Sequence, residues 1–217
     1  MRALIASGTG RYADPWHPYE RTSPLLGALL ERCGFTVRIR DDVDAAMRDL
    51  VDVDLLVVNA GDPWRGDSTQ SAPDSSVTGL AEALRDGLGV LAMHSATASL
   101  RDYPEWAEAT GAIWMPKLSW HPPAGVAEIR GLSLPDGDEV DDFTVFDERY
   151  LRLQQVGRSH VVAQHTHEGH LSPTSWVREA GRSRVAVDLL GHDERSYESH
   201  AHVELISRLA RWATRRS

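Results

Sequence analysis

The stretch Gly87-Leu-Gly-Val-Leu-Ala-Met-His-Ser-Ala-Thr97 decides which fold this chain is expected to adopt. Val90–Met93 is a short apolar run, typical of a strand that is buried on both faces. Ser95–Ser99 are small residues that can begin a helix after a sharp turn. His94 is therefore expected at the carboxyl end of a central strand, where α/β proteins bind their ligands. The alternative is a buried histidine bonded to a neighbouring backbone group.

Strand and helix signals alternate along the chain before this stretch. Apolar runs typical of strands occur at Arg2–Ser7, Phe35–Ile39 and Asp54–Asn59, and helical patterns occur near 22–34, 42–50 and 79–86. The order β-α-β-α-β-α-β requires right-handed crossovers between parallel strands. We therefore predict an α/β fold with a doubly wound, mostly parallel sheet.

The first helix is expected to begin at Thr22 or Ser23, because these residues cap helices and Pro24 is tolerated in a first turn. Its apolar stripe would consist of Leu25, Leu26, Leu29 and Leu30, and Gly34 would end it. A polar loop without periodicity is predicted at Gly61–Ser76. The glycines after the first strand lack the spacing of a dinucleotide-binding fingerprint, so we reject that site.

The second half of the chain continues with shorter elements and no linker. A helix is predicted at Tyr103–Thr110, strands at Val126–Ile129, Phe143–Phe146, Val161–His165, Ser175–Glu179 and Arg184–Leu190, and a closing helix at Ser199–Arg215. A hairpin loop is expected at Gln164–Thr174. Residues 1–217 are therefore predicted to form a single domain.

Composition restricts the partners of the chain. The 217 residues include 32 acidic and 23 basic ones, a formal net charge of −9 that argues against nucleic-acid binding. No apolar run is long enough for a membrane span and no signal-like leader is present, so a cytoplasmic protein is expected. Cys33 is the only cysteine, which excludes an intrachain disulfide and a cysteine-based zinc cluster.

Several stretches together resemble the ThuA-like family, which is named for trehalose utilisation. They are Leu4–Gly8 with His17, Gly87–Ala96, Asp102-Tyr103 with Trp106 and Gly111, Phe143–Tyr150, Trp176, and Leu190–Asp193. The resemblance covers nearly the whole chain. It implies a flavodoxin-like, three-layer fold similar to that of class I glutamine amidotransferases, and a role in disaccharide metabolism.

The resemblance to amidotransferases fails at the expected nucleophile. Those enzymes carry a cysteine at the strand-to-helix elbow and a His-x-Glu pair after a later strand. Here His94 stands at the elbow and His192 with Glu194 in the later place, while Cys33 belongs to another element. An imidazole is far less suited to forming a thioester-type intermediate, so no glutaminase activity is predicted.

Two histidines and a carboxylate are the candidate catalytic residues. His94 and His192 follow strands predicted to be neighbours, and Glu148 follows the strand Phe143–Phe146. Imidazole titrates near neutral pH and a carboxylate such as Asp147 or Glu148 can orient it, which suits general acid–base catalysis. The alternatives are a turn of solvated charges around Glu148 and a surface histidine beside a helix-capping Asp193.

A divalent metal is an additional hypothesis for the same residues. His17, His94 and His192 with Glu148 offer the nitrogen and oxygen ligands that zinc accepts, with a position left for water or a sugar hydroxyl. A second pair, His165 and His167, shares one face of a strand, but the same stretch also reads as part of a hairpin loop.

The remaining candidates would bind a small-molecule carbohydrate. Tyr150 would donate a hydrogen bond to a substrate oxygen, and Trp16, Trp120 and the nearby Trp114 would stack on sugar rings. His17, His121 and Asp193 complete the predicted substrate-binding set, although His121 lies beside two prolines and also fits a purely structural role.

Two functions are therefore predicted, from different classes. The first is an enzyme that processes a sugar or keto-sugar derivative by histidine and carboxylate chemistry, with or without a metal. The second is a non-catalytic carbohydrate-binding or assembly module on an amidotransferase-like scaffold. The sequence does not fix the substrate or the reaction, and a homodimer is an open alternative.

Overall fold

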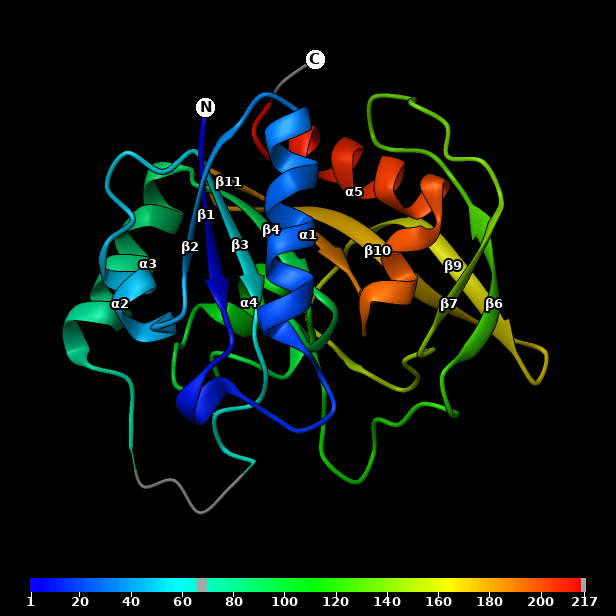
Figure 1. Cartoon of the computed structure of the whole chain (residues 1–217), viewed down its shortest axis with the longest axis horizontal. Coiled ribbons are helices and arrows are strands. Elements are labelled where there is room, and N and C mark those ends of the chain that lie inside the picture. The colour runs from blue at the N-terminus through cyan, green and yellow to red at the C-terminus, as the bar shows by residue number, and fades with distance from the viewer. Residues whose placement is uncertain (66–69, 216–217) are drawn as a thin grey trace.

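The apolar runs of the sequence form the strands of one large sheet. The computed structural model describes residues 1–65 and 70–215, and the described part contains a nine-stranded sheet in the order β2-β1-β3-β4-β11-β10-β9-β6-β7 (Figure 1). The parallel strands are β2 (Thr36–Arg40), β1 (Arg2–Ser7), β3 (Leu55–Asn59), β4 (Gly89–Met93) and β11 (Ser183–Asp188). In Figure 1 these strands run downward, so their carboxyl ends lie at the lower side of the sheet.

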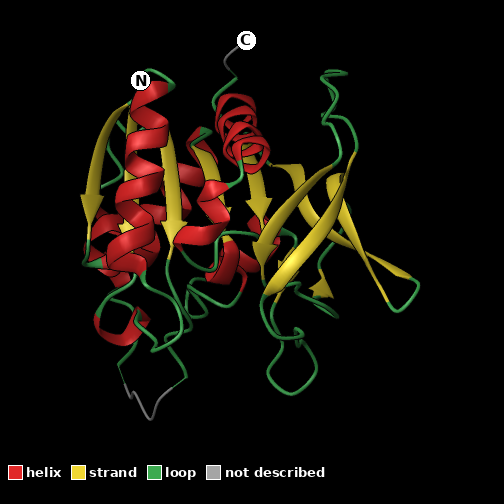
Figure 2. Ribbon diagram, turned by 45° about the vertical axis from the view of Figure 1, so that its right-hand side comes forward, coloured by secondary structure: helices red, strands yellow, loops and turns green. Residues whose placement is uncertain are grey.

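Antiparallel strands extend the sheet beyond β11. They are β10 (His170–Ala180), β9 (His160–His167), β6 (Gly125–Gly131) and β7 (Phe143–Asp147). A separate small sheet pairs β5 (Ala112–Ile113) with β8 (Gln154–Gln155). Figure 2 shows that the antiparallel strands curve away from the parallel ones.

Helices cover both faces of the parallel strands, as in a three-layer sandwich. One face carries α1 (Tyr19–Arg32) and α5 (His200–Ala213), and the other carries α2 (Val43–Arg48), α3 (Asp74–Asp86) and α4 (Trp106–Thr110). Single turns of 3-10 helix occur at η1 (Gly10–Tyr12), η2 (His94–Thr97) and η3 (Glu194–Glu198). The predicted α/β fold with a doubly wound central sheet is confirmed.

The two faces are buried by alternate residues of the same strand. In β3, Leu55 and Val57 pack under α1, whereas Leu56 and Val58 pack under α2 and α3. Successive side chains of a strand point to opposite faces, so a strand covered on both sides must be apolar throughout. This is why β3 has no polar residue before Asn59 and β4 has none before His94.

The first helix begins earlier than predicted. α1 starts at Tyr19, and Thr22 and Ser23 are buried in its second turn rather than acting as caps. Their hydroxyls accept hydrogen bonds from the Asn59 amide at 2.9 and 3.0 Å, and Pro24 lies inside the helix rather than at its start. Leu25 is exposed and lies outside the apolar stripe.

The hairpin predicted at Gln164–Thr174 has far less loop than expected. β9 and β10 pair up to His167 and His170, so Glu168 and Gly169 alone make the turn. Both residues have positive φ, 48° and 79°, which suits a tight turn whose twist matches the strands. α3 also begins at Asp74, inside the stretch predicted as a polar loop, of which residues 66–69 lie outside the described part.

Three further results concern the helices of the fold. The stretch Ser95–Ser99, predicted to begin a helix, forms only the 3-10 turn η2, and the closing helix ends at Ala213. Among the described residues, no helix combines the length and the apolar character needed to cross a membrane.

Candidate functional site

His94 stands at the strand-to-turn elbow after β4. Its backbone is left-handed, with φ 44°, a conformation that L-residues adopt at a cost and that is found at strained functional turns. The side chain is 1% exposed, and Nδ1 lies 2.7 Å from the carbonyl oxygen of Leu189. Since a carbonyl only accepts, Nδ1 carries a proton and Nε2 faces the interior of the site.

His192 follows β11, the sheet neighbour of β4, as the sequence predicted. Gly191 before it has φ 111°, and the carboxylate of Asp147 accepts hydrogen bonds from the amide of Gly191 at 2.7 Å and from the Ser196 hydroxyl. This buried carboxylate joins the end of β7 to the loop after β11. The segment after β7 is therefore fixed relative to the loop after β11, although β7 lies at the edge of the sheet.

Glu148 follows Asp147 and lies among the histidines. Its Oε2 is 3.5 Å from His94 Nε2 and 3.4 Å from His192 Nδ1, and its Oε1 is 3.4 Å from His121 Nδ1. Burial opposes ionisation, but the hydrogen bond and charge of His94, with the charges of His192 and His121, lower the pKa of Glu148. Glu148 is thus a carboxylate surrounded by three imidazoles.

His17 approaches from the opposite side, in the loop between η1 and α1. Its Nδ1 lies 2.8 and 2.7 Å from the two carboxylate oxygens of Asp14, whereas its Nε2 is buried without a hydrogen-bond partner. The loop itself is fixed by Arg11, whose guanidinium bonds Asp44 and Asp102 at 2.9 Å each. His17 is therefore held in place by groups outside the site.

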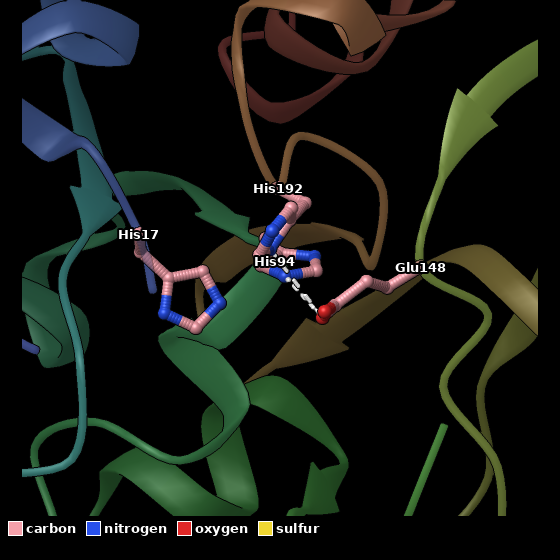
Figure 3. A group of neighbouring side chains, drawn as sticks. All are labelled: His17, His94, Glu148 and His192. Atoms are coloured by element: carbon pink, nitrogen blue, oxygen red, sulfur yellow. Dashed lines mark ion pairs between the residues drawn. The ribbon is translucent and has the colours of Figure 1, made fainter. Parts of the chain in front are cut away.

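The four side chains converge on one point (Figure 3). One ligand atom each from His17, His94, Glu148 and His192 lies within 4.8 Å of the others. Zinc and similar ions bind imidazole nitrogen and carboxylate oxygen at about 2.0–2.2 Å, so small movements would bring all four atoms to ligand distance. The His/Glu cluster could therefore hold a metal ion.

The protonation states fit this arrangement. Burial lowers the pKa of His17 and of His192 and the charge of His94 lowers both further; for His17 the hydrogen bond to Asp14 opposes this shift without reversing it. For His94 burial also opposes the charge, but Glu148 and Asp147 outweigh it and raise the pKa. Two nitrogen lone pairs and one carboxylate are thus available, and a cation would replace the proton of His94.

Aromatic rings line one side of the cluster. The Tyr150 hydroxyl is 3.0 Å from His94 Nε2, and its ring contacts those of Trp114 and His121, with centroids 4.5 and 5.5 Å away. Burial and the charge of Glu148 raise the pKa of Tyr150 well above its ordinary value, so the hydroxyl is a hydrogen-bond donor. Tyr150 and His121 therefore both contact the cluster, Tyr150 through His94 and His121 through Glu148.

Other predicted residues lie at the margin. Trp16 is 62% exposed under the guanidinium of Arg65, and Trp120 is 38% exposed with its ring edge toward His167. Asp193 caps η3 and pairs with Arg195, which occupies its carboxylate. Both indoles stay accessible to a sugar, whereas Asp193 would have to leave a partner to bind one.

Two sequence hypotheses are not supported by the geometry. Glu194, which completes the His-x-Glu pattern with His192, forms an ion pair with Arg21 at 2.8 Å, so the pattern does not place a carboxylate on His192 as in amidotransferases. His165 and His167 are not part of the metal-ligand group found among the described residues. Burial lowers the pKa of His165 to about 4, so its ring is a neutral buried group.

Sequence reasoning missed Asp14, although a signal for it exists. Asp14-Pro-Trp-His17 and Asp62-Pro-Trp-Arg65 share the same three first residues and follow the neighbouring strands β1 and β3. In both, the aspartate Oδ1 accepts the amide of the tryptophan two residues later at 2.9 Å. A repeated turn sequence after adjacent strands would have pointed to both loops as parts of one edge.

Comparisons with known proteins agree with this architecture. The profile of the ThuA family, described as trehalose utilisation, matches residues 2–213. A solved structure described as a ThuA-like protein from Parabacteroides merdae is 18% identical, with a TM-score of 0.77 over 98% of this chain and 89% of that chain. A search of curated protein sequences finds no match.

More distant structures show the same fold. A glutamine amidotransferase from Thermotoga maritima is 11% identical, with a TM-score of 0.54 over 98% of this chain and 97% of that one. A β-galactosidase from Halorubrum lacusprofundi is 12% identical, with a TM-score of 0.62 over 98% of this chain but only 30% of that one. The fold thus occurs both as a whole chain and as part of a larger one.

Proposed function

The chain belongs to the ThuA family of trehalose utilisation, and we propose that it is a metal-assisted enzyme that acts on a sugar or keto-sugar derivative. One observation carries the proposal: the ligand atoms of His17, His94, Glu148 and His192 lie within 4.8 Å of one another. Family membership supports a role in carbohydrate metabolism. The chemistry rests on the site.

The donor set fits a borderline transition metal. His17 Nε2 and His192 Nδ1 are buried without hydrogen-bond partners, which is costly unless a ligand satisfies them. Three imidazoles and one carboxylate suit zinc or a similar divalent ion rather than the all-oxygen shell of magnesium or calcium. Such an ion would supply Lewis-acid polarisation of a sugar hydroxyl or carbonyl oxygen.

The protein groups around the cluster would handle the proton and orient the substrate. Glu148 Oε1, which faces His121, is the oxygen available to accept a proton from a substrate hydroxyl or carbon acid. His121 would orient this carboxylate, because its Nδ1 lies 3.4 Å from Glu148 Oε1 and 3.0 Å from the carbonyl oxygen of Pro122. Tyr150 would donate a hydrogen bond to a substrate oxygen.

Sugar recognition would come from the aromatic margin. Trp114 lies against Tyr150 and His121, and the exposed indoles of Trp16 and Trp120, which adjoin His17 and His121 in the chain, would add surface for a sugar. Indole faces stack on the apolar faces of pyranose rings while hydroxyls reach polar neighbours. This arrangement favours a saccharide over a purely aliphatic substrate.

Metal analysis tests the proposal directly. Untagged protein purified without chelator should hold about one divalent transition-metal ion per chain. His94→Ala and His192→Ala should lose it, whereas His200→Ala, which removes an exposed histidine at the start of α5, should keep it. A metal-free protein that takes up no zinc or cobalt on titration would contradict the proposal.

Turnover provides the second test. Trehalose, maltose and their keto derivatives would be incubated with the metal-loaded protein and followed by NMR for product. We expect turnover of at least one sugar, its loss in His94→Ala, and its retention in His200→Ala. Turnover that is equal in His94→Ala and the wild type would remove the cluster from the mechanism.

A binding module is the second candidate. The β-galactosidase similarity, which covers only 30% of that chain, favours it because the same fold there forms part of a larger protein. On this hypothesis the chain binds a sugar from the same panel with a measurable heat of binding but forms no product. Calorimetry beside the NMR assay separates the two functions.

A further inference from the structure

We propose that Asp14 is a positioning residue of the site, which fixes the ring of His17 so that Nε2 is presented to a metal ion. The inference rests on the proposed function of the His/Glu cluster as a metal centre. It assigns a role to a residue that touches neither the other ligands nor the substrate side of the cluster.

Asp14 gathers donors from one short segment. Its Oδ1 accepts the backbone amides of Trp16 and His17, both at 2.9 Å, and its Oδ2 accepts the Tyr19 hydroxyl at 3.0 Å. The His17 Nδ1 lies 2.7 and 2.8 Å from the two oxygens. Because a carboxylate only accepts, the contact requires the proton of His17 to be on Nδ1.

This proton position determines what His17 can bind. With Nδ1 protonated, the lone pair of a neutral ring is on Nε2, and this atom is buried, without a partner, and within the cluster. Histidines that bind metals commonly donate their second N–H to a carboxylate or carbonyl group, which sets the tautomer and raises ligand basicity. His94 has the corresponding contact, with the carbonyl of Leu189.

The carboxylate is tied to the elbow of the fold as well as to its own loop. The Tyr19 hydroxyl that bonds Asp14 also lies 2.8 Å from the Ser95 hydroxyl, next to His94. Gly61 leaves room for this contact, because a Cβ there would lie 2.7 Å from Asp14 Oδ2 and 2.8 Å from the Tyr19 oxygen. Through Tyr19 and Ser95, Asp14 therefore links His17 to the end of β4, which carries His94.

Asp62 offers a matched control on the neighbouring strand. It makes the same contact with the amide of Trp64, at 2.9 Å, but its carboxylate pairs with Arg101 at 2.8 Å and bonds no histidine. Replacing either aspartate by asparagine removes one buried charge from one Asp-Pro-Trp turn. Only Asp14→Asn changes the group that accepts from His17 Nδ1, because the amide has one acceptor oxygen and no charge in place of the carboxylate.

The experiment measures cobalt and zinc binding to the metal-free wild type, Asp14→Asn and Asp62→Asn, with competition by a chromophoric chelator. We expect Asp14→Asn to weaken binding by about 10–100-fold and to change the visible spectrum of bound Co²⁺, which reports ligand geometry. Asp62→Asn should bind with the affinity and the spectrum of the wild type. Far-UV circular dichroism establishes that each variant is folded.

The outcomes are separable. Equal affinity and an identical cobalt spectrum in Asp14→Asn and the wild type would overturn this inference and leave the proposed metal centre intact. A wild type that binds no metal would overturn both. NMR of ¹⁵N-histidine in the metal-free wild type, with His17 assigned by its loss in His17→Ala, gives a test without an Asp14 variant: an Nδ1–H tautomer supports the role and an Nε2–H tautomer overturns it.

Discussion

The two Asp-Pro-Trp turns, 14–16 and 62–64, have the same local structure but different roles. Both follow neighbouring parallel strands, and both are closed by an aspartate that accepts the amide of a tryptophan at 2.9 Å. Both tryptophans are exposed, 62% and 56%, and each lies beneath an arginine. Local sequence thus determines the turn in each case.

The two turns differ in the residue that follows the tryptophan, His17 in the first and Arg65 in the second, and in what that residue contacts. His17 reaches the cluster, whereas Arg65 lies 4.8 Å from the Trp16 ring and donates to the carbonyl of Ala13 at 3.3 Å. The second turn thus contacts the first but contributes no side chain to the His/Glu cluster. In both turns the residue after the tryptophan is placed at the edge of the sheet. The surrounding residues determine whether its side chain reaches the His/Glu cluster, as His17 does, or packs against the other turn, as Arg65 does.

The strongest test of this difference replaces by alanine the residue that follows each turn, His17 or Arg65. His17→Ala should weaken zinc or cobalt binding by more than about 100-fold, because losing a ligand costs more than losing the group that orients one. Arg65→Ala should bind close to the wild-type affinity. A chelator competition measures both, and a similar loss in the two variants would show that the turns act as one structural unit.

The pair His202–Asp188 lies outside both turns, and it serves to separate effects on the free energy of unfolding from effects on metal binding. His202 is fully buried with Nε2 2.9 Å from Asp188, and although burial opposes the charge, Asp188 raises the pKa of His202. A raised pKa gives stability that is present below the ordinary value of about 6.5 and is lost as pH rises through the folded value.

His202→Gln should therefore be less stable than the wild type by about 1.5–3 kcal/mol at acidic pH, with a smaller difference above neutrality. Urea unfolding of the metal-free proteins across this range measures it. If the difference grows with pH, the assigned charge of His202 is wrong. Constant metal affinity in His202→Gln would confirm that the turns, and not global stability, control binding.

Gly61 tests the close approach of the segment after β3 to Asp14. An added Cβ would lie 2.7 Å from Asp14 Oδ2 and 2.9 Å from the carbonyl of Tyr12, so Gly61→Ala should cost about 1–3 kcal/mol through overpacking. It should also weaken metal binding although it changes no ligand. Gly125→Ala is the control, since its Cβ would meet only Pro123, at 3.9 Å. Thermal unfolding and chelator competition compare the two, and equal behaviour would argue against the close approach.

The smallest expected effect concerns the two exposed indoles. Trp16→Ala should weaken binding of a turned-over saccharide by about 0.5–1.5 kcal/mol, the usual range for one aromatic contact. Trp64→Ala should bind the sugar nearly as the wild type does, because its turn carries no residue of the cluster. Calorimetry measures both, and a larger loss in Trp64→Ala would move the sugar to the second turn.

Much of the fold was predictable because local patterns determine it. Apolar runs covered on both faces specified β1, β3, β4 and β11, and the position of His94 and His192 after neighbouring parallel strands followed from that topology. The predicted bounds of an element were wrong where a tertiary contact outweighed the local preference of its residues. α1 gains its first turn because Thr22 and Ser23 bond Asn59 instead of capping the helix.

The sequence by itself determined the parallel sheet, the histidine at its elbow and the chemical types of the ligands, since each depends on residues close together in the chain. Only the tertiary structure decided that Glu148, at the end of the far edge strand, meets these histidines, and that Asp14 rather than Asp62 faces one of them. The physical reason is the curvature of the antiparallel strands and the burial of Asp147, whose hydrogen bond to Gly191 joins segments 44 residues apart. No pattern of neighbouring residues encodes such a contact.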